Sequence, residues 1–212
     1  MHVRSSDGVE VAVHDLGGEG APVLMAHATG FHGRVWQPLA EALRGLHCWS
    51  VDLRAHGDTV LPEEAELRWE GFADDVLAAV DALGLVEPFG VGHSGGAAAL
   101  LLAEQRRPGT FRGLYLYEPV VMPPELWAEQ PDPDNVLSAG ARRRRRAFDS
   151  HDAAYENFAA KAPFDRLDPA ALRAYVDHGF APGPDGDVVL KCVPEREAEV
   201  YAAAGLHRAH GD

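Results

Sequence analysis

The sequence predicts an α/β fold with a doubly wound, mostly parallel sheet, because strand-like runs alternate with helical patterns over residues 1–120. The runs at 22–27, 47–52 and 89–93 are largely apolar, as in parallel strands that are covered on both faces. The alternation then stops, and residues 121–212 show helical patterns separated by prolines and glycines. We therefore expect two regions, a core at 1–120 and a helical lid region with a C-terminal tail at 121–212.

The elements of the core follow from the spacing of apolar side chains. Alternating valines at positions 9, 11 and 13 follow an Asp7-Gly8 turn, which predicts a hairpin within Met1–Asp15 at the sheet edge. The helices carry apolar residues at helical spacing: Trp36, Leu39 and Leu43 in the first, and Trp69, Phe72, Val76, Val80 and Leu83, closed by Gly84, in the second. A third helix over 95–107 and a strand over 113–118 complete the core.

The region after the core is predicted to be mainly helical. Asp168 and Pro169 are a favourable cap and first residue for a helix that ends at Gly179. Further helices are expected over 152–162 and 195–204, and only 188–193 has strand character. The five consecutive arginines Arg142–Arg146 are interpreted as part of one exposed helix.

Charge and composition limit the function classes. Lys and Arg number 19 against 33 Asp and Glu, a net charge of −14, which argues against a nucleic-acid partner or an anionic membrane surface. The N-terminal residues lack the apolar core of a signal peptide, so a cytoplasmic protein is expected. Cys48 and Cys192 have no metal-ligand spacing and are expected to be free thiols.

The segment with the clearest chemistry is Gly92-His93-Ser94-Gly95-Gly96, which matches the pattern G-x-S-x-G at a strand-to-helix turn. Such a turn exposes the serine hydroxyl above the end of the sheet and directs free N–H groups of the following helix toward it. Ser94 is therefore a candidate nucleophile. The alternative is that Ser94 only caps the helix.

Three motifs in this order resemble the α/β-hydrolase superfamily, specifically serine hydrolases with a helical lid after the sixth strand. They are His27-Ala28-Thr29-Gly30-Phe31, Asp52-Leu53-Arg54-Ala55-His56-Gly57-Asp58-Thr59 and the Ser94 turn. Ala28 and Ala55 stand where the family usually has glycine, and neither change removes a functional side chain. The resemblance implies that Ser94 is the nucleophile and that the N–H groups of Thr29 and Gly95 form the oxyanion hole.

Several other residues are candidates for the site, each with a structural role as the alternative. Glu118, at the end of a strand, is a possible catalytic acid. Phe31, Trp127, Tyr155 and Phe158 could line an acyl pocket, although helical aromatics are more often core. His27 is interpreted as a hydrogen bonder that fixes its loop and His93 as a packing residue, whereas His207 and His210 are interpreted as an exposed polar tail.

In the family, the acid and histidine of the triad follow the seventh and eighth strands, but the lid takes most of the residues after Ser94 and nothing after Ala204 has a strand pattern. We therefore expect a truncated chain or fragment. The function expected of the complete fold is hydrolysis of a small, mostly apolar ester, lactone or related acyl compound, with no cofactor and no metal. The alternatives are a non-catalytic ligand-binding protein or inactive fragment, and a perhydrolase, acyltransferase or carbon–carbon hydrolase. The oligomeric state is open.

Overall fold

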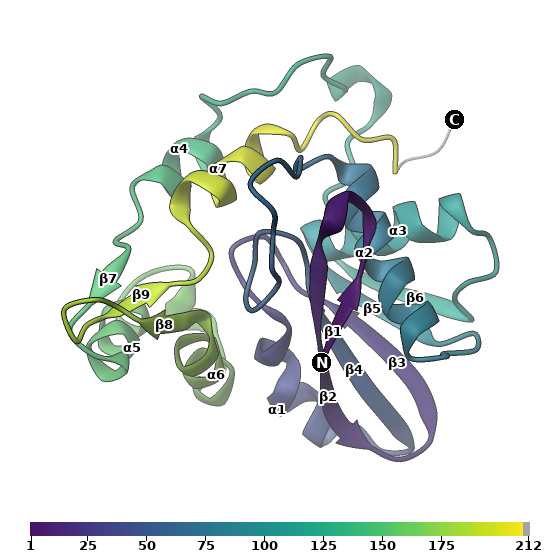
Figure 1. Ribbon diagram of the computed structural model, residues 1–212, viewed down its shortest axis with the longest axis horizontal. Helices are drawn as coiled ribbons and strands as arrows, with labels where there is room; N and C mark the ends of the chain where they lie inside the picture. Colours follow the sequence, from purple (N-terminus) through teal and green to yellow (C-terminus); the bar gives the residue numbers. More distant parts are fainter. Residues whose placement is uncertain (210–212) are drawn as a thin grey trace.

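The computed structural model describes residues 1–209, and its core is a six-stranded mixed sheet of order β1-β2-β4-β3-β5-β6 (Figure 1). The strands are β1 (His2–Arg4), β2 (Glu10–Gly18), β3 (Ala21–Ala26), β4 (Leu46–Asp52), β5 (Phe89–His93) and β6 (Gly113–Tyr117). The β1–β2 and β2–β4 pairs are antiparallel, and the remaining pairs are parallel. The predicted N-terminal hairpin and the doubly wound sheet are confirmed.

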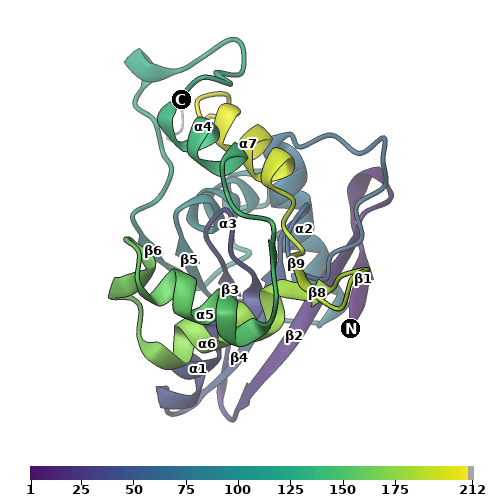
Figure 2. The same ribbon diagram turned by 90° about the vertical axis from the view of Figure 1, so that its left-hand side faces the viewer.

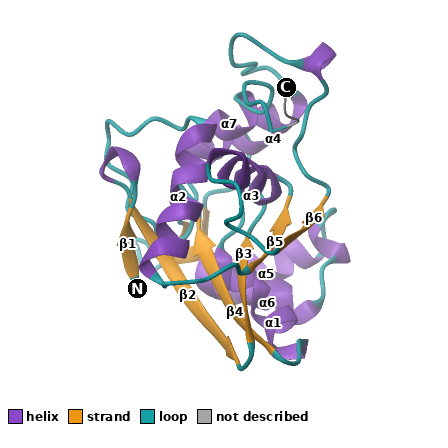
Figure 3. Cartoon of the chain, turned by 90° about the vertical axis from the view of Figure 1, so that its right-hand side faces the viewer, coloured by secondary structure: helices purple, strands orange, loops and turns teal. Residues whose placement is uncertain are grey.

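Helices cover both faces of this sheet (Figure 3). Helices α2 (Trp69–Ala82) and α3 (Gly95–Arg106) pack on the face to which Leu24 and Ala26 of β3 point. The alternate residues Val23 and Met25 point to the other face, toward α1 (Gln37–Ala42). This two-sided burial explains why β3 is apolar at successive positions.

β6 is the last strand of the sheet among the described residues, so its outer backbone edge has no strand partner there. Tyr115 and Tyr117 lie on the same face of β6 and are 68% and 55% exposed. The sheet face beside them is hollowed by an apolar groove of about 920 Å³, lined in part by Trp36, Leu39 and Phe89.

Residues 121–209, called here the C-terminal region, contain α4 (Val136–Arg142), α5 (His151–Ala159), α6 (Pro169–Gly179) and α7 (Pro194–Ala202). The Asp168 side chain caps α6 by accepting a hydrogen bond from the Ala170 N–H at 2.8 Å, as predicted. Within residues 1–209, no helix is both long and apolar enough to cross a bilayer.

The same region also holds a small antiparallel sheet of order β7-β9-β8, of which only β9 coincides with a predicted strand. Its strands are β7 (Ala147–Phe148), β8 (Phe180–Pro182) and β9 (Val188–Leu190). Two or three residues are too few to show a period-2 pattern, so β7 and β8 were not predictable.

Helices α4 and α7 lie side by side (Figure 2), and the Ser138 hydroxyl of α4 donates to the Ala198 carbonyl of α7 at 2.9 Å. The expectation of one exposed arginine helix is wrong, because α4 ends at Arg142. The next four arginines form an irregular link to β7, and the Arg144 side chain is only 16% exposed. Its carboxylate partner in α7 explains why this arginine turns inward.

Candidate functional site

Ser94 occupies a strained corner between β5 and α3, with φ 51° and ψ −117°. Its N–H donates to the Tyr117 carbonyl of β6 at 3.0 Å, which fixes the corner to the neighbouring strand. A Cβ atom placed on Gly96 would lie 2.4 Å from the Ala26 carbonyl oxygen, and one on Gly92 would lie 2.6 Å from the Ala97 Cα. These glycines are therefore required for the close approach of α3 to the sheet.

The Ser94 side chain makes no capping hydrogen bond to α3, so the capping alternative is wrong. Among residues 1–209, none accepts a hydrogen bond from Gly95 N–H or Gly96 N–H, as expected for the first turn of a helix. These donors and the positive end of the helix dipole favour negative charge at the N-terminus of α3.

The loop after β3 brings Thr29 beside this helix terminus. A Cβ atom placed on Gly95 would lie 2.7 Å from the Thr29 Oγ1 and 3.7 Å from the Thr29 nitrogen. Across the described chain, no acceptor is bonded to the Thr29 N–H. The structure therefore brings the three sequence-predicted residues Ser94, Gly95 and Thr29 together at the carboxyl ends of β3 and β5.

Two buried histidines hold this loop. The Nδ1 of His27 bonds to the Ala28 carbonyl at 2.8 Å, and its Nε2 accepts from the Leu53 N–H at 3.0 Å. Burial lowers the pKa of His27 to about 3, so its ring is neutral at pH 7. The interpretation of His27 as a loop-fixing residue agrees with these bonds.

His56 fixes the next residue of the loop. Its Nε2 accepts from the Gly30 N–H at 2.9 Å, and its Nδ1 bonds to the Arg54 carbonyl at 2.9 Å. Burial lowers the pKa of His56 to about 4, so the ring keeps one acceptor nitrogen at pH 7. Both ring nitrogens of His27 and of His56 are therefore hydrogen-bonded to backbone groups.

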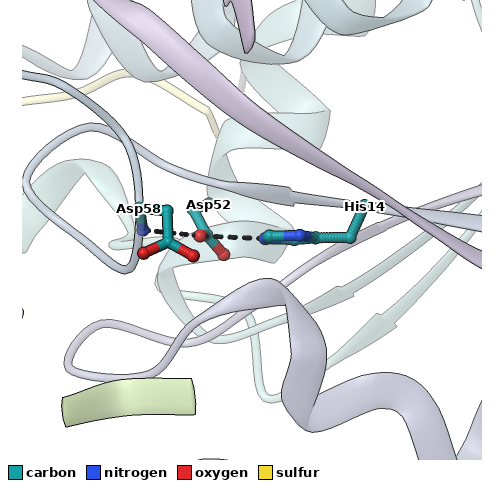
Figure 4. A group of neighbouring side chains, drawn as sticks. All are labelled: His14, Asp52 and Asp58. Atoms are coloured by element: carbon teal, nitrogen blue, oxygen red, sulfur yellow. Dashed lines mark hydrogen bonds and ion pairs between the residues drawn. The ribbon is translucent and has the colours of Figure 1, made fainter. Parts of the chain in front are cut away.

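Asp52, at the end of β4, anchors the other end of the loop. It accepts hydrogen bonds from the Gly33 N–H at 2.6 Å and the Asp58 N–H at 2.8 Å, and the His14 Nε2 lies 2.9 Å from its Oδ2 (Figure 4). Burial alone would raise the pKa of Asp52, but the hydrogen bond and charge of His14 outweigh it and lower that pKa.

His14, Asp52 and Asp58 each offer a ligand atom, and these atoms lie within 4.8 Å of one another. The Asp52 oxygens are already engaged by N–H donors, and the Lys191 ammonium lies 2.6 Å from an Asp58 oxygen. Loop anchoring accounts for this group, with Lys191 tying the C-terminal region to the core.

A buried ion pair lies over the same loop. The Arg144 guanidinium donates to Glu197 of α7 and to the hydroxyl of Tyr175 in α6. A Cβ atom placed on Gly30 would lie 2.5 Å from a Glu197 oxygen and 3.2 Å from an Arg144 nitrogen. Apart from the arginine run, no sequence pattern predicts this group, because its members lie on separate elements.

A cavity of about 490 Å³ extends from Thr29 and Gly30 into the C-terminal region. Phe31 and Phe158, two of the four aromatic residues predicted for an acyl pocket, are among its lining residues. Trp127 and Tyr155 are not among them: Arg208 lies over the Trp127 ring, and Arg173 over the Tyr155 ring. A role for any of the four in substrate binding stays a prediction.

The remaining candidates for acid and base make no hydrogen bond to the Ser94 hydroxyl among residues 1–209. Glu118 is exposed, and among residues 1–209 no carboxylate or histidine hydrogen-bonds to the Ser94 side chain. The interpretation of His207 as exposed is wrong, since it is 2% exposed and packs on Trp69 with ring centroids 4.5 Å apart. His210 lies outside the described residues. The acid and base roles stay unassigned.

Comparisons with known proteins agree with this architecture. Residues 23–208 match the model of the Alpha/beta hydrolase family. Human monoglyceride lipase is 29% identical over an alignment of 130 residues, which covers 57% of this chain and 43% of the lipase. The match therefore spans less than half of the length of that relative.

Solved structures show the same fold at low identity. The structure of E-2-(acetamidomethylene)succinate hydrolase superposes with a TM-score of 0.73 and 21% identity, covering 95% of this chain and 73% of that chain. A thermophilic esterase from Thermogutta terrifontis gives a TM-score of 0.66 and 19% identity, covering 99% of this chain and 73% of that one.

Proposed function

The chain belongs to the alpha/beta hydrolase family, and from this premise we propose that it is a serine hydrolase acting on a small, mostly apolar ester, lactone or related acyl compound. The observation that carries the proposal is the Ser94 corner, where a serine whose side chain makes no capping hydrogen bond lies next to the free N–H groups of Thr29 and Gly95. The lipase and esterase among the similar proteins support ester substrates.

The chemistry is acyl transfer through a covalent intermediate. The Ser94 oxygen bonds to the acyl carbon, the bond from that carbon to the leaving alcohol breaks, and the proton of Ser94 passes through a general base to the alcohol. Water then attacks the acyl carbon, releases the acid and restores the Ser94 hydroxyl. The N–H groups of Thr29 and Gly95 stabilise the oxyanion at each step, and one such donor is worth about 2.7–4 kcal/mol.

A small-molecule substrate, a cofactor-free reaction and a cytoplasmic location are part of the same proposal.

The neutral His27 and His56 do not serve as the base, because both ring nitrogens of each are engaged by the backbone.

The test is covalent labelling of the purified chain with a fluorophosphonate probe, followed by peptide mapping. We expect the label on Ser94 and on no other serine, because among residues 1–209 only this serine combines a strand-to-helix corner with adjacent free N–H donors. Ser94→Ala should remove the label, and Ser5→Ala should leave it unchanged. A label that survives Ser94→Ala, or no label on a folded chain, contradicts the proposal.

The second candidate is a non-catalytic ligand-binding protein of the same fold. The engagement of both loop histidines by the backbone favours it, because these rings hold the loop rather than move protons. A folded chain that takes no label but binds esters would support this candidate. A perhydrolase, acyltransferase or carbon–carbon hydrolase uses the same serine, and product analysis would separate these reactions.

A further inference from the structure

The cavity that begins at Thr29 is positively charged, although the chain as a whole has a net charge of −14. Its lining includes Arg143, Arg144, Arg145 and Lys161, against the single carboxylate of Glu197. A concave surface with one sign of charge focuses its field and raises the local concentration of the opposite charge. The cavity therefore favours an anionic ligand.

Arg144 is the cation held most firmly in this cavity. Its Nη1 donates to Glu197 and its Nη2 donates to Tyr175, and the Arg144 and Glu197 side chains are 16% and 6% exposed. A guanidinium has five N–H donors, so these two bonds leave others for a ligand. An arginine fixed in this way recognises a carboxylate with little loss of side-chain entropy.

The rest of the lining indicates what else the ligand contains. Phe31, Phe158 and Phe164 form an aromatic wall, with ring centroids 5.6 Å apart for Phe31 and Phe164 and 4.7 Å for Phe158 and Phe164. Such a wall suits a hydrocarbon segment. The cavity thus offers an N–H donor at Thr29, an apolar wall, and cations at Arg144 and its neighbours.

We propose that the substrate is an acyl compound that carries a carboxylate, with the carboxylate held in the cavity by Arg144 and with Arg143 and Lys161 adding to the attraction. This inference rests on the proposed function, since it deepens the substrate class from an apolar ester to an ester of a dicarboxylic acid. The apolar segment between the carboxylate and the ester group lies along the aromatic wall.

The experiment is calorimetric titration of Ser94→Ala, which cannot turn over substrate, with monomethyl glutarate and with dimethyl glutarate. The two probes differ in one carboxylate. Hydrogen bonds to charged groups are stronger than those between neutral groups, so we expect monomethyl glutarate to bind at least about tenfold more tightly than dimethyl glutarate. Equal or weaker binding of the monoester, or no binding of either probe, overturns the inference.

Two variants in the Ser94→Ala background locate the effect. Arg143→Gln with Lys161→Gln removes two exposed cations, and Arg144→Gln with Glu197→Gln removes the buried pair without leaving an unpaired charge. We expect each double variant to lower the preference for monomethyl glutarate over dimethyl glutarate at least about threefold. The control is Arg4→Gln with Arg44→Gln. Both arginines are exposed and lie within residues 1–120, and the double substitution lowers the net charge by the same amount as the first pair.

The control should keep the full preference for the monoester. If the control loses as much of the preference for the monoester as the cavity variants do, the site is not in this cavity and the inference fails. The inference also fails if both cavity variants keep this preference. Circular dichroism on each variant excludes loss of fold as the cause. Binding to Ser94→Ala does not depend on catalysis, so failure here is distinct from failure of Ser94 labelling.

Discussion

Gly95 and Thr29 approach each other closely in the candidate site, and this approach leaves little room for a side chain on Gly95. A Cβ atom there would lie 2.7 Å from the Thr29 Oγ1, so Gly95→Ala should displace Thr29 and misplace its N–H donor. We expect up to about a 100-fold loss of kcat in ester hydrolysis, the effect of weakening one oxyanion donor.

Gly140→Ala in α4 is the matched control, because no atom lies within 4 Å of its added Cβ. Because Gly140 lines the same cavity as Thr29, the control readout is the thermal midpoint, which should stay within experimental error or rise slightly, as expected for alanine in a helix. Wild-type kcat in a folded Gly95→Ala variant would contradict the role assigned to the Gly95–Thr29 contact.

The two loop histidines make stability depend on pH. Burial lowers the pKa of His27 to about 3 and of His56 to about 4, whereas in the unfolded chain both titrate near 6.5. The unfolded state therefore binds more protons below about pH 6.5, and the free energy of unfolding falls as the pH decreases from there toward 4. At about pH 5, each histidine should lower the free energy of unfolding by on the order of 2 kcal/mol.

Urea unfolding at about pH 7 and pH 5 measures this dependence. His56→Gln removes one titrating group, so it should be less stable than wild type at pH 7 but should lose less stability on going to pH 5. A variant whose loss between the two pH values equals that of wild type would show that His56 is not a buried neutral histidine.

At the scale of elements, the contact between β3 and α3 depends on Gly96. A Cβ atom on Gly96 would lie 2.4 Å from the Ala26 carbonyl oxygen, and a backbone atom cannot move aside as a side chain can. Gly96→Val should therefore push α3 off the sheet and destabilise the fold by about 1–3 kcal/mol or more. Thermal unfolding against the Gly140→Ala control tests this, and an unchanged midpoint would contradict it.

β6 exposes both a backbone edge and two tyrosines, and such strands pair with other strands. We expect the chain to self-associate through this strand at micromolar concentration, because two copies of one edge strand can pair antiparallel about a twofold axis. Tyr115→Lys should shift sedimentation toward monomer. A concentration-independent monomer in wild type would contradict this expectation.

The core elements were predictable from sequence because each carries a long, clear period. β3 is apolar at nearly every position and α2 repeats apolar residues at helical spacing over fourteen residues. β7 and β8 are too short for a pattern, and the arginine link after α4 resembles a polar helix in sequence. These elements take their conformation from neighbours that are distant in the chain.

At the scale of the whole molecule, the parts of the site that sequence motifs encode were predictable. Ser94, Gly95 and Thr29 lie in two motifs at the ends of neighbouring parallel strands, so the topology brings them together. Arg144 and Glu197 are 53 residues apart and meet only because α4 packs beside α7. The burial of His207 against Trp69 likewise depends on the path of the chain after α7.

Mass spectrometry of the intact chain and of its peptides, after mixing with p-nitrophenyl butyrate, measures directly whether Ser94 forms an acyl-enzyme. We expect a covalent butyryl group on the peptide that contains Ser94, formed together with a burst of p-nitrophenol, and the loss of both in Ser94→Ala. Ester hydrolysis that persists in Ser94→Ala at the wild-type rate, with no acylated Ser94 peptide in either protein, would contradict it.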